Sequence, residues 1–183
     1  MRPLIAHGTA TGLPVERLEA SLRLEAGTRG EGALITAQYR VTGDITRVSV
    51  PRGTGGRTDG LWRHTCFEFF VRSAGDAAYV EVNVAPSREW AIYAFTDYRA
   101  GQRALDGIEP PQIDVAVSLT QLELVATVPV AALLPAPHDR IAASLSAVIE
   151  ERDGRLSYWA LAHPDSARPD FHHAGSFVHE IRY

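Results

Sequence analysis

Residues 61–71, LWRHTCFEFFV, contain two kinds of side chain that alternate, and this alternation is the clearest indication of the fold. Successive side chains of a β-strand point to opposite faces. Phe67 and Phe69 would therefore face a core, while His64 and Glu68 would face away from it. The alternation predicts a strand with one apolar face and one largely polar face.

The same alternation recurs along most of the chain, with turn signals rich in Gly, Pro, Ser and Asp between the runs. About ten strands of this kind are typical of an all-β sandwich or barrel. We expect residues 1–183 to form one domain. The predicted strands lie within residues 18–25, 33–41, 45–51, 61–71, 77–85, 89–99, 112–120, 121–130, 139–151, 155–164 and 176–183.

Three local features need separate treatment. Gly43 and Asp44 form a short break that suits a hairpin between the runs on either side of them. Residues 128–135, VPVAALLP, are bounded by prolines and predict a short helical turn. Residues 141–151 contain good helix formers, but their apolar side chains alternate, so we expect a strand.

Composition excludes several classes of protein. All 18 basic residues are arginines, net charge is −4, and no basic block suggests binding to nucleic acid. No apolar run has the length of a signal peptide core or a membrane span, so we expect a cytoplasmic protein with no membrane partner. Cys66 is the only cysteine, which excludes an internal disulfide and a tetrahedral cysteine zinc site. The oligomeric state is left open.

The polar face of the central strands is the candidate site. If residues 73–78 form a hairpin loop, then Glu68, Glu81 and Asn83 gather on one face of a sheet. Tryptophans and tyrosines occur close by in the sequence. Aromatic rings stack on the C–H faces of sugars, and carboxylates and amides pair with sugar hydroxyls. The alternation is equally typical of a solvated outer face, and that alternative stays open.

A resemblance narrows these possibilities. The pattern WRHTCFEFFV followed by YVEVNVAPSREWAIYAFTDYR resembles the DOMON-like superfamily, which is related to family 9 carbohydrate-binding modules and to haem- or sugar-binding DOMON domains. The similarity is strongest over residues 61–99 and returns at residues 163–173, HPDSARPDFHH. It implies an antiparallel β-sandwich of the immunoglobulin-like or jelly-roll kind, with a ligand groove over one sheet. It also implies that Glu68 and Asn83 contact the ligand.

We therefore expect non-catalytic binding of a small carbohydrate-like ligand, with no cofactor and no metal. In this hypothesis the tryptophans stack on the ligand, the carboxylates and the amide hold its hydroxyls, and two arginines and two histidines lie at the edge. The Gly-rich residues 51–60 would form a loop beside the site, from which Arg52, Arg57 and Asp59 can reach a ligand. The candidate site residues are Trp62, Arg63, Glu68, Glu81, Asn83, Arg88, Trp90, Trp159, His163 and His172.

Two alternatives remain. Glu68 and Glu81 could serve as the carboxylate pair of a carbohydrate-processing enzyme, because glycosidases need two carboxylates at a defined separation. A haem-binding DOMON-like domain is the other alternative, and it would need a histidine ligand because Met1 is the only methionine. A nucleophile pair of His64 and Cys66 is weaker than either, since no third group to orient them is evident.

Overall fold

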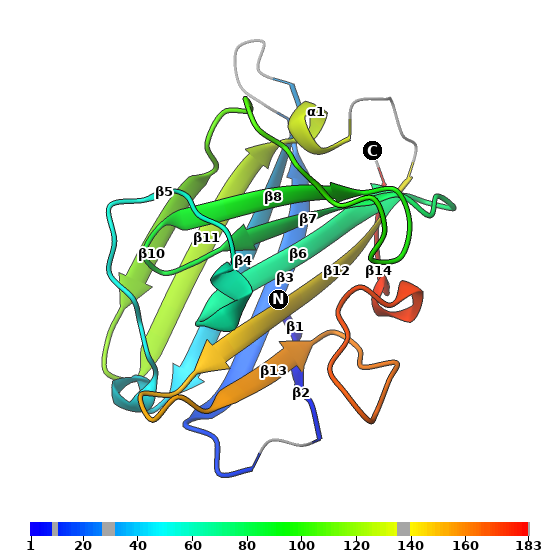
Figure 1. Ribbon diagram of the computed structural model, residues 1–183. Coiled ribbons are helices and arrows are strands. Elements are labelled where there is room, and N and C mark those ends of the chain that lie inside the picture. The colour runs from blue at the N-terminus through cyan, green and yellow to red at the C-terminus, as the bar shows by residue number, and fades with distance from the viewer. Residues whose placement is uncertain (9–10, 27–31, 135–139, 183) are drawn as a thin grey trace.

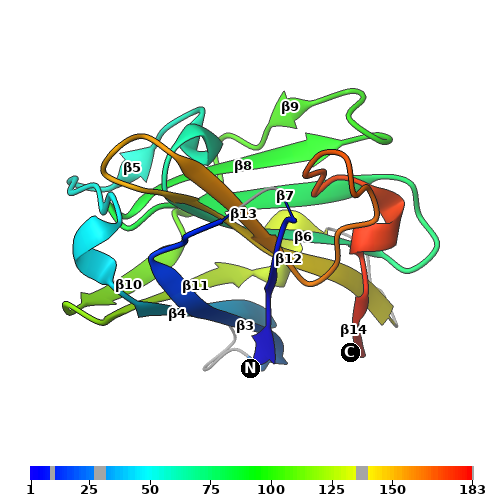
Figure 2. The same ribbon diagram turned by 90° about the horizontal axis from the view of Figure 1, so that it is seen from below.

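The protein is a sandwich of two β-sheets, as the sequence predicts. The structure is a computed structural model, and it describes residues 1–8, 11–26, 32–134 and 140–182. Figure 1 shows the larger sheet in front of the smaller one, and Figure 2 shows the two layers from below. In the described part of the chain, no helix is long and apolar enough to cross a membrane.

The smaller sheet has five strands, all paired antiparallel. Its three long strands alternate between buried and more exposed side chains, so one face packs inward and the other lies toward solvent. In spatial order they are β1 (Arg2–Pro3), β3 (Val15–Glu25), β4 (Leu34–Gly43), β11 (Gln121–Pro129) and β10 (Gln112–Val117).

The larger sheet has nine strands, and its pairs are antiparallel except for β5 on β8. Two short strands lie off the main path, β14 (His179–Arg182) beside β12 and β9 (Arg103–Ala104) beside β8. The main path runs β2 (Ile5–Ala6), β13 (Leu156–Ala160), β12 (Arg140–Glu150), β6 (Cys66–Ser73), β7 (Tyr79–Val84), β8 (Glu89–Phe95) and β5 (Gly56–Arg57).

The main core lies between the sheets and is built by the alternation seen in the sequence. Each fully buried aliphatic or aromatic side chain contributes roughly 1.5–3 kcal/mol through its removal from water. The largest side chains that are less than 2 % exposed and belong to this core are Leu18, Ile35, Tyr39, Phe67, Phe69, Ile92, Leu122, Leu124, Ile141, Leu145 and Ile149.

Strands β6 and β7 are buried on both faces over most of their length. Their outward side chains form a second apolar cluster, which includes Phe70, Tyr79, Phe95 and Phe171. Phe171 comes from the C-terminal segment, so this segment lies over the outer face of the larger sheet. The outer face is therefore partly covered, and this cover creates the pocket described below.

The predicted helical turn and the strand over residues 141–151 are confirmed. The turn is α1 (Val130–Leu133), and Pro135, which was expected to bound it, lies outside the described residues. The prediction of a hairpin at residues 43–44 is wrong, because β4 pairs with β3 and β11 and not with the residues that follow Asp44. The strand expected at residues 45–51 is also wrong. Ile45–Arg47 is a 3₁₀ helix, which begins where the Asp44 carboxylate accepts a hydrogen bond from the Thr46 N–H.

Candidate functional site

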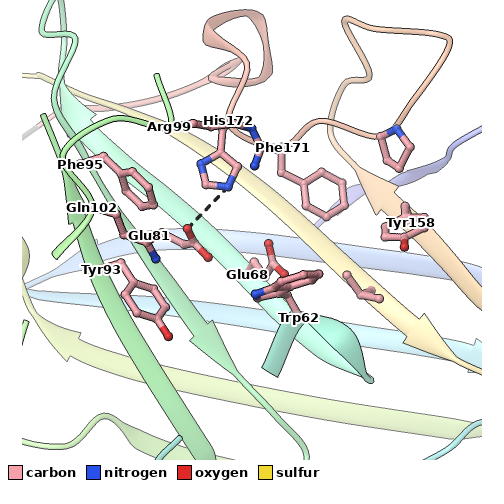
Figure 3. A pocket seen from close by; sticks show the side chains of 12 residues that line it. Trp62, Glu68, Glu81, Tyr93, Phe95, Arg99, Gln102, Tyr158, Phe171 and His172 are labelled. Carbon is pink, nitrogen blue, oxygen red and sulfur yellow. Dashed lines mark ion pairs between the residues drawn. The ribbon is translucent and has the colours of Figure 1, made fainter. Parts of the chain in front are cut away.

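A pocket of about 450 Å³ opens on the outer face of the larger sheet, away from the smaller sheet (Figure 3). Cavities of this size accommodate small organic ligands. Strands β6, β7, β8, β12 and β13 contribute to its floor, and loops from three other parts of the chain form its walls. The lining residues are Trp62, Glu68, Glu81, Tyr93, Phe95, Arg99, Gln102, Val148, Tyr158, Pro169, Phe171 and His172.

Strand register brings the acidic side chains of the floor together. Glu68 on β6 lies opposite Asn83 on β7, and Glu81 lies opposite Phe70 on one side and Tyr93 on the other. Glu68 and Glu81 are therefore diagonal neighbours on adjacent strands, a relationship that places Cα atoms about 7–8 Å apart. The hairpin of β6 and β7 produces the grouping that the sequence suggested.

The carboxyl group of Glu68 is buried without full hydrogen bonding. Glu68 is 3 % exposed, and its Oε1 has no hydrogen-bond partner among the described residues. The hydroxyls of Ser144 and of Ser146, which lies opposite Glu68 on β12, are also buried without a partner there. Burial raises the pKa of Glu68 well above its usual value, and the neighbouring Glu81 raises it further, while Arg99 opposes this.

Glu81 is held from two directions. The Asn83 amide donates a hydrogen bond of 2.5 Å to Oε1 of Glu81, and Nε2 of His172 lies 3.7 Å from Oε2. Burial raises the pKa of Glu81, although the hydrogen bond from Asn83 and the charge of Arg99 oppose the shift. The floor thus contains two buried carboxyl groups that influence each other.

His172 completes a chain of hydrogen bonds above the floor. The Arg99 backbone N–H donates to the hydroxyl of Tyr79 at 3.1 Å, so this hydroxyl directs its own proton to Nδ1 of His172 at 2.8 Å. We assign the ring proton to Nε2 on this network, which points the N–H at Glu81. Burial and the charge of Arg99 lower the pKa of His172 to about 4, so the ring is neutral at pH 7.

Asp170 accepts hydrogen bonds from both of the loops that form one wall of the pocket. Its carboxylate accepts hydrogen bonds from the Tyr98 hydroxyl at 2.6 Å, from Arg99 Nη2 at 2.8 Å and from the His172 backbone N–H at 3.2 Å. Burial alone would raise the pKa of Asp170, but the bonds from Tyr98 and Arg99 outweigh it and lower that pKa. The loop after β8 and the C-terminal segment are therefore joined at one buried charge.

The Gly-rich loop lies beside the opposite wall. Asp59 accepts a hydrogen bond of 2.5 Å from the hydroxyl of Tyr93, which lines the pocket. Arg57 forms ion pairs of 3.0 Å with Asp59 and with Asp106. Arg52 lies elsewhere, in a separate surface hollow between the ends of the two sheets.

Four of the ten predicted site residues line the pocket, namely Trp62, Glu68, Glu81 and His172. Trp62 precedes β6 in a short 3₁₀ helix and is 50 % exposed. Asn83 is 1 % exposed and lies beneath the lining, where it orients Glu81. In Figure 3, Glu68, Glu81 and Trp62 lie around the same space.

The other two tryptophans lie in the inter-sheet core, which corrects their expected role as stacking surfaces. Trp90 pairs with Val84, and Trp159 pairs with Ala147, and both partners face the core. Trp90 is 7 % exposed and Trp159 6 %, so neither ring is open to a ligand in this pocket. The alternation along β8 already indicates this difference, because Trp90 and Tyr93 are three residues apart in one strand and must point to opposite faces.

The remaining three predicted residues also lie outside the pocket lining. Arg88 occupies a turn with a φ of 66° and lines the separate hollow near Arg52. The guanidinium of Arg63 lies over the Trp62 ring, 5.2 Å from its centroid. Nε2 of His163 lies 2.8 Å from the carbonyl oxygen of Ile5.

Sequence reasoning did not assign eight of the lining residues to the site. Tyr93 and Phe95 could have been found, because they share the face of Glu81 if β7 and β8 form a hairpin. Arg99 and Phe171 belong to loops whose positions no local pattern indicates. His64 and Cys66 lie outside the pocket lining: His64 pairs with Glu150 at 3.0 Å, and Cys66 is fully buried, which raises the pKa of its thiol.

Comparison with known proteins gives a likeness of fold. No protein-family model matches the chain, and no curated protein matches it. Among solved structures, the chain is similar to "a putative carbohydrate-binding protein" from Bacteroides uniformis, with a TM-score of 0.63 and 19 % identity. The match covers 96 % of this chain and 83 % of the other, so it extends over the whole sandwich.

Proposed function

We propose that the protein binds a small carbohydrate-like ligand in the pocket on the larger sheet and does not transform it. The observation that carries this proposal is the buried carboxyl group of Glu68 on the floor of a cavity with aromatic walls, because one of its oxygens has no hydrogen-bond partner in the part of the chain that the structure describes. Leaving such an oxygen without a partner costs about 1–3 kcal/mol. A bound hydroxyl or other donor would recover that cost.

The lining suits the two kinds of surface that a sugar ring presents. Sugar C–H faces stack on aromatic rings, and Trp62 offers a half-exposed indole at the edge of the pocket. Sugar hydroxyls need paired donors and acceptors. Glu68 and Glu81 can supply acceptors, and Gln102 adds an amide on the wall.

Two likenesses support the carbohydrate class. The fold neighbour from Bacteroides uniformis is described as carbohydrate-binding in the words quoted above. The resemblance to the DOMON-like superfamily and to family 9 carbohydrate-binding modules implies Glu68 and Asn83 as ligand contacts. In this proposal Glu68 contacts the ligand directly, and Asn83 acts through Glu81.

Titration calorimetry with a panel of monosaccharides and disaccharides tests the proposal. We expect the best ligand to lose about tenfold or more in affinity with Trp62→Ala, which corresponds to about 1.4 kcal/mol. Leu119→Ala removes a side chain that is 74 % exposed in the other surface hollow and should leave affinity unchanged. Equal losses in both variants, or no binding of any sugar, would contradict the proposal.

A carbohydrate-processing enzyme is the second candidate, and one observation favours it. Glu68 and Glu81 are both buried carboxyl groups with raised pKa values, the environment that a general acid needs. Aryl glycosides provide the assay. Turnover that disappears in Glu68→Gln would support the enzyme over the binding protein, whereas no turnover by the wild type would leave the binding proposal in place.

The haem-binding alternative has less support from the geometry. Nδ1 of His172 accepts a hydrogen bond from the Tyr79 hydroxyl, and Nε2 faces Glu81 at 3.7 Å. Neither nitrogen of this pocket histidine is therefore directed at open space where an iron could bind. Titration of the protein with hemin checks this directly. A sharp Soret band that is lost in His172→Phe would overturn the carbohydrate proposal.

A further inference from the structure

The pocket contains two carboxyl groups, and the cationic side chains that the structure describes near it do not form ion pairs with both of them. Glu68 and Glu81 are 3 % and 5 % exposed, and no salt bridge to Glu68 is present in the described part of the chain. Glu81 faces His172 at 3.7 Å, but this ring is neutral: its Nδ1 accepts a hydrogen bond from the Tyr79 hydroxyl, and burial and Arg99 lower its pKa to about 4. Two buried carboxyl groups therefore share one cavity without a cation of their own.

The arginines around the pocket already have other partners. Arg99 forms an ion pair of 2.8 Å with Asp170, a carboxylate that is 5 % exposed. Arg57 pairs with both Asp59 and Asp106. Arg99 lies near enough to lower the pKa values of both floor glutamates, but its charge is balanced by Asp170.

The walls add a second attraction for a positive charge. Trp62, Tyr93, Phe95 and Phe171 line the cavity from three segments of the chain, since Tyr93 and Phe95 both belong to β8. The face of an aromatic ring is negative and attracts a cation by about 0.5–2 kcal/mol, more when the site is desolvated. Arginines already lie over the rings of Trp62 and Tyr93, so these rings accept cations in this structure. Aromatic rings beside buried carboxyl groups suit an ammonium group better than a neutral hydroxyl alone.

We infer that the ligand of this pocket carries a protonated amine, as an amino sugar does, and that its ammonium group lies between Glu68 and Glu81 under the aromatic walls. This inference rests on the proposed function for its sugar part. The amine is inferred from the two buried carboxyl groups and from Oε1 of Glu68, which has no hydrogen-bond partner among the described residues.

Proton release provides an independent signature. Burial raises the pKa of both floor carboxyl groups, and the charge of Glu81 raises that of Glu68 further, so these shifts favour retention of a proton by the pair in the free protein. An ammonium group stabilises both carboxylates and expels that proton to the buffer. Other titratable groups surround the pair. They are His172 and Tyr79 above, Tyr93 with Asp59 on one wall, Arg99 with Asp170 on the other, Tyr158 in the lining, Cys66 beside Asn83, and Tyr39 on the core side of Glu68.

Calorimetry with matched sugars tests the inference on the wild-type protein. The pairs are glucose with glucosamine, galactose with galactosamine, and mannose with mannosamine, with the N-acetylated sugars as amine-blocked controls. At about pH 6 the sugar amine is largely protonated. We expect at least one amino sugar to bind tenfold or more tightly than its neutral and acetylated counterparts. Its binding enthalpy should differ between phosphate and MES buffers, both of which accept protons at this pH, in the sense of proton release.

Two variants and one further probe make the outcomes distinct. Glu68→Gln should abolish the preference for the amine, and Glu81→Gln provides a second test if the first variant folds poorly by circular dichroism. Neutral sugars that bind as tightly as amino sugars, without proton release, would overturn the amine and leave sugar binding intact. Cyclohexylamine that binds through Glu68 while every sugar fails would support the amine and contradict the proposed function. Failure of all these compounds would overturn both.

Discussion

The hydroxyl of Tyr39 donates a hydrogen bond of 2.6 Å to the backbone carbonyl of Glu68. Tyr39 belongs to β4 in the smaller sheet, and Glu68 belongs to β6 in the larger one. The bond crosses the inter-sheet core directly behind the pocket floor. The site-bearing strand is thereby fixed to the opposite sheet at the residue whose side chain faces the ligand cavity.

Tyr39→Phe should destabilise the fold by about 0.5–1.5 kcal/mol, because it removes one buried hydrogen bond and keeps the ring. Tyr39 is fully buried, and burial raises the pKa of its phenol well above the usual value, so the hydroxyl remains a donor at any moderate pH. Chemical denaturation measures the change. An unchanged free energy of unfolding would show that the inter-sheet bond contributes nothing to stability.

Glu68→Gln should stabilise the protein more at about pH 8 than at about pH 4.5. The folded-state pKa of Glu68 is raised, so above the unfolded value of about 4.3 the folded protein holds a proton that the unfolded chain has lost. Stability from this group therefore falls as pH rises through that window. The glutamine keeps the shape and does not titrate.

The free energy of unfolding of wild type and variant at the two pH values checks this prediction. Glu123→Gln, on the outer face of the smaller sheet and paired with Arg40, is the matched control. A gain for Glu68→Gln that is equal at both pH values would mean that Glu68 does not titrate differently in the two states.

His172 should make the protein lose stability in mild acid. Its folded-state pKa is lowered to about 4 from about 6.5, so between these values the unfolded chain binds a proton that the folded chain does not. The contribution of His172 to the free energy of unfolding is complete above about pH 6.5. It is lost as pH falls toward 4, by up to about 3 kcal/mol.

His172→Phe should remove this part of the pH dependence. Comparing unfolding free energies of wild type and variant from about pH 4 to 7 isolates it from the opposite trend of Glu68. His64→Phe changes a histidine side chain that is 64 % exposed and paired with Glu150 and serves as the control. Parallel pH profiles for wild type and His172→Phe would contradict the prediction.

Asp170→Asn should loosen the wall of the pocket. The variant keeps the shape of the side chain but removes the charge that Arg99 and Tyr98 bind, and disruption of a buried charge network costs about 3–5 kcal/mol at most. Amide hydrogen exchange should increase in residues 96–102 and 169–173. Asp165→Asn, in the same segment but 36 % exposed in its side chain, should leave both regions protected.

The three tryptophans should separate into two kinds of residue. Trp90→Ala and Trp159→Ala each remove a ring from the inter-sheet core and should cost about 3–5 kcal/mol. Trp62→Ala removes a half-exposed ring and should change stability by less than about 1 kcal/mol while weakening ligand binding. Thermal denaturation compares the three variants, and a large loss of stability in Trp62→Ala would overturn the distinction.

Much of the fold follows from local pattern. The alternation in β3, β4, β6, β7, β11 and β12 is strong because one face of each strand must enter the core, and a shift of one residue would reverse every side chain. Where the pattern was short, prediction failed. At Ile45–Arg47 the local bond from Thr46 to Asp44 outweighed the β-propensity of the apolar residues.

Strand parity, together with a hairpin between β6 and β7, is enough to predict that Glu68, Glu81 and Asn83 share one face, and the observed register confirms it. Strand parity does not indicate that this face is covered. Asp170, Phe171 and His172 reach β6 and β7 from about 90 residues further along the chain, and Arg99 meets them from a third segment. The burial of both carboxyl groups and the neutral state of His172 arise only from that contact. Packing between distant segments removes water from the floor, and no local pattern specifies it.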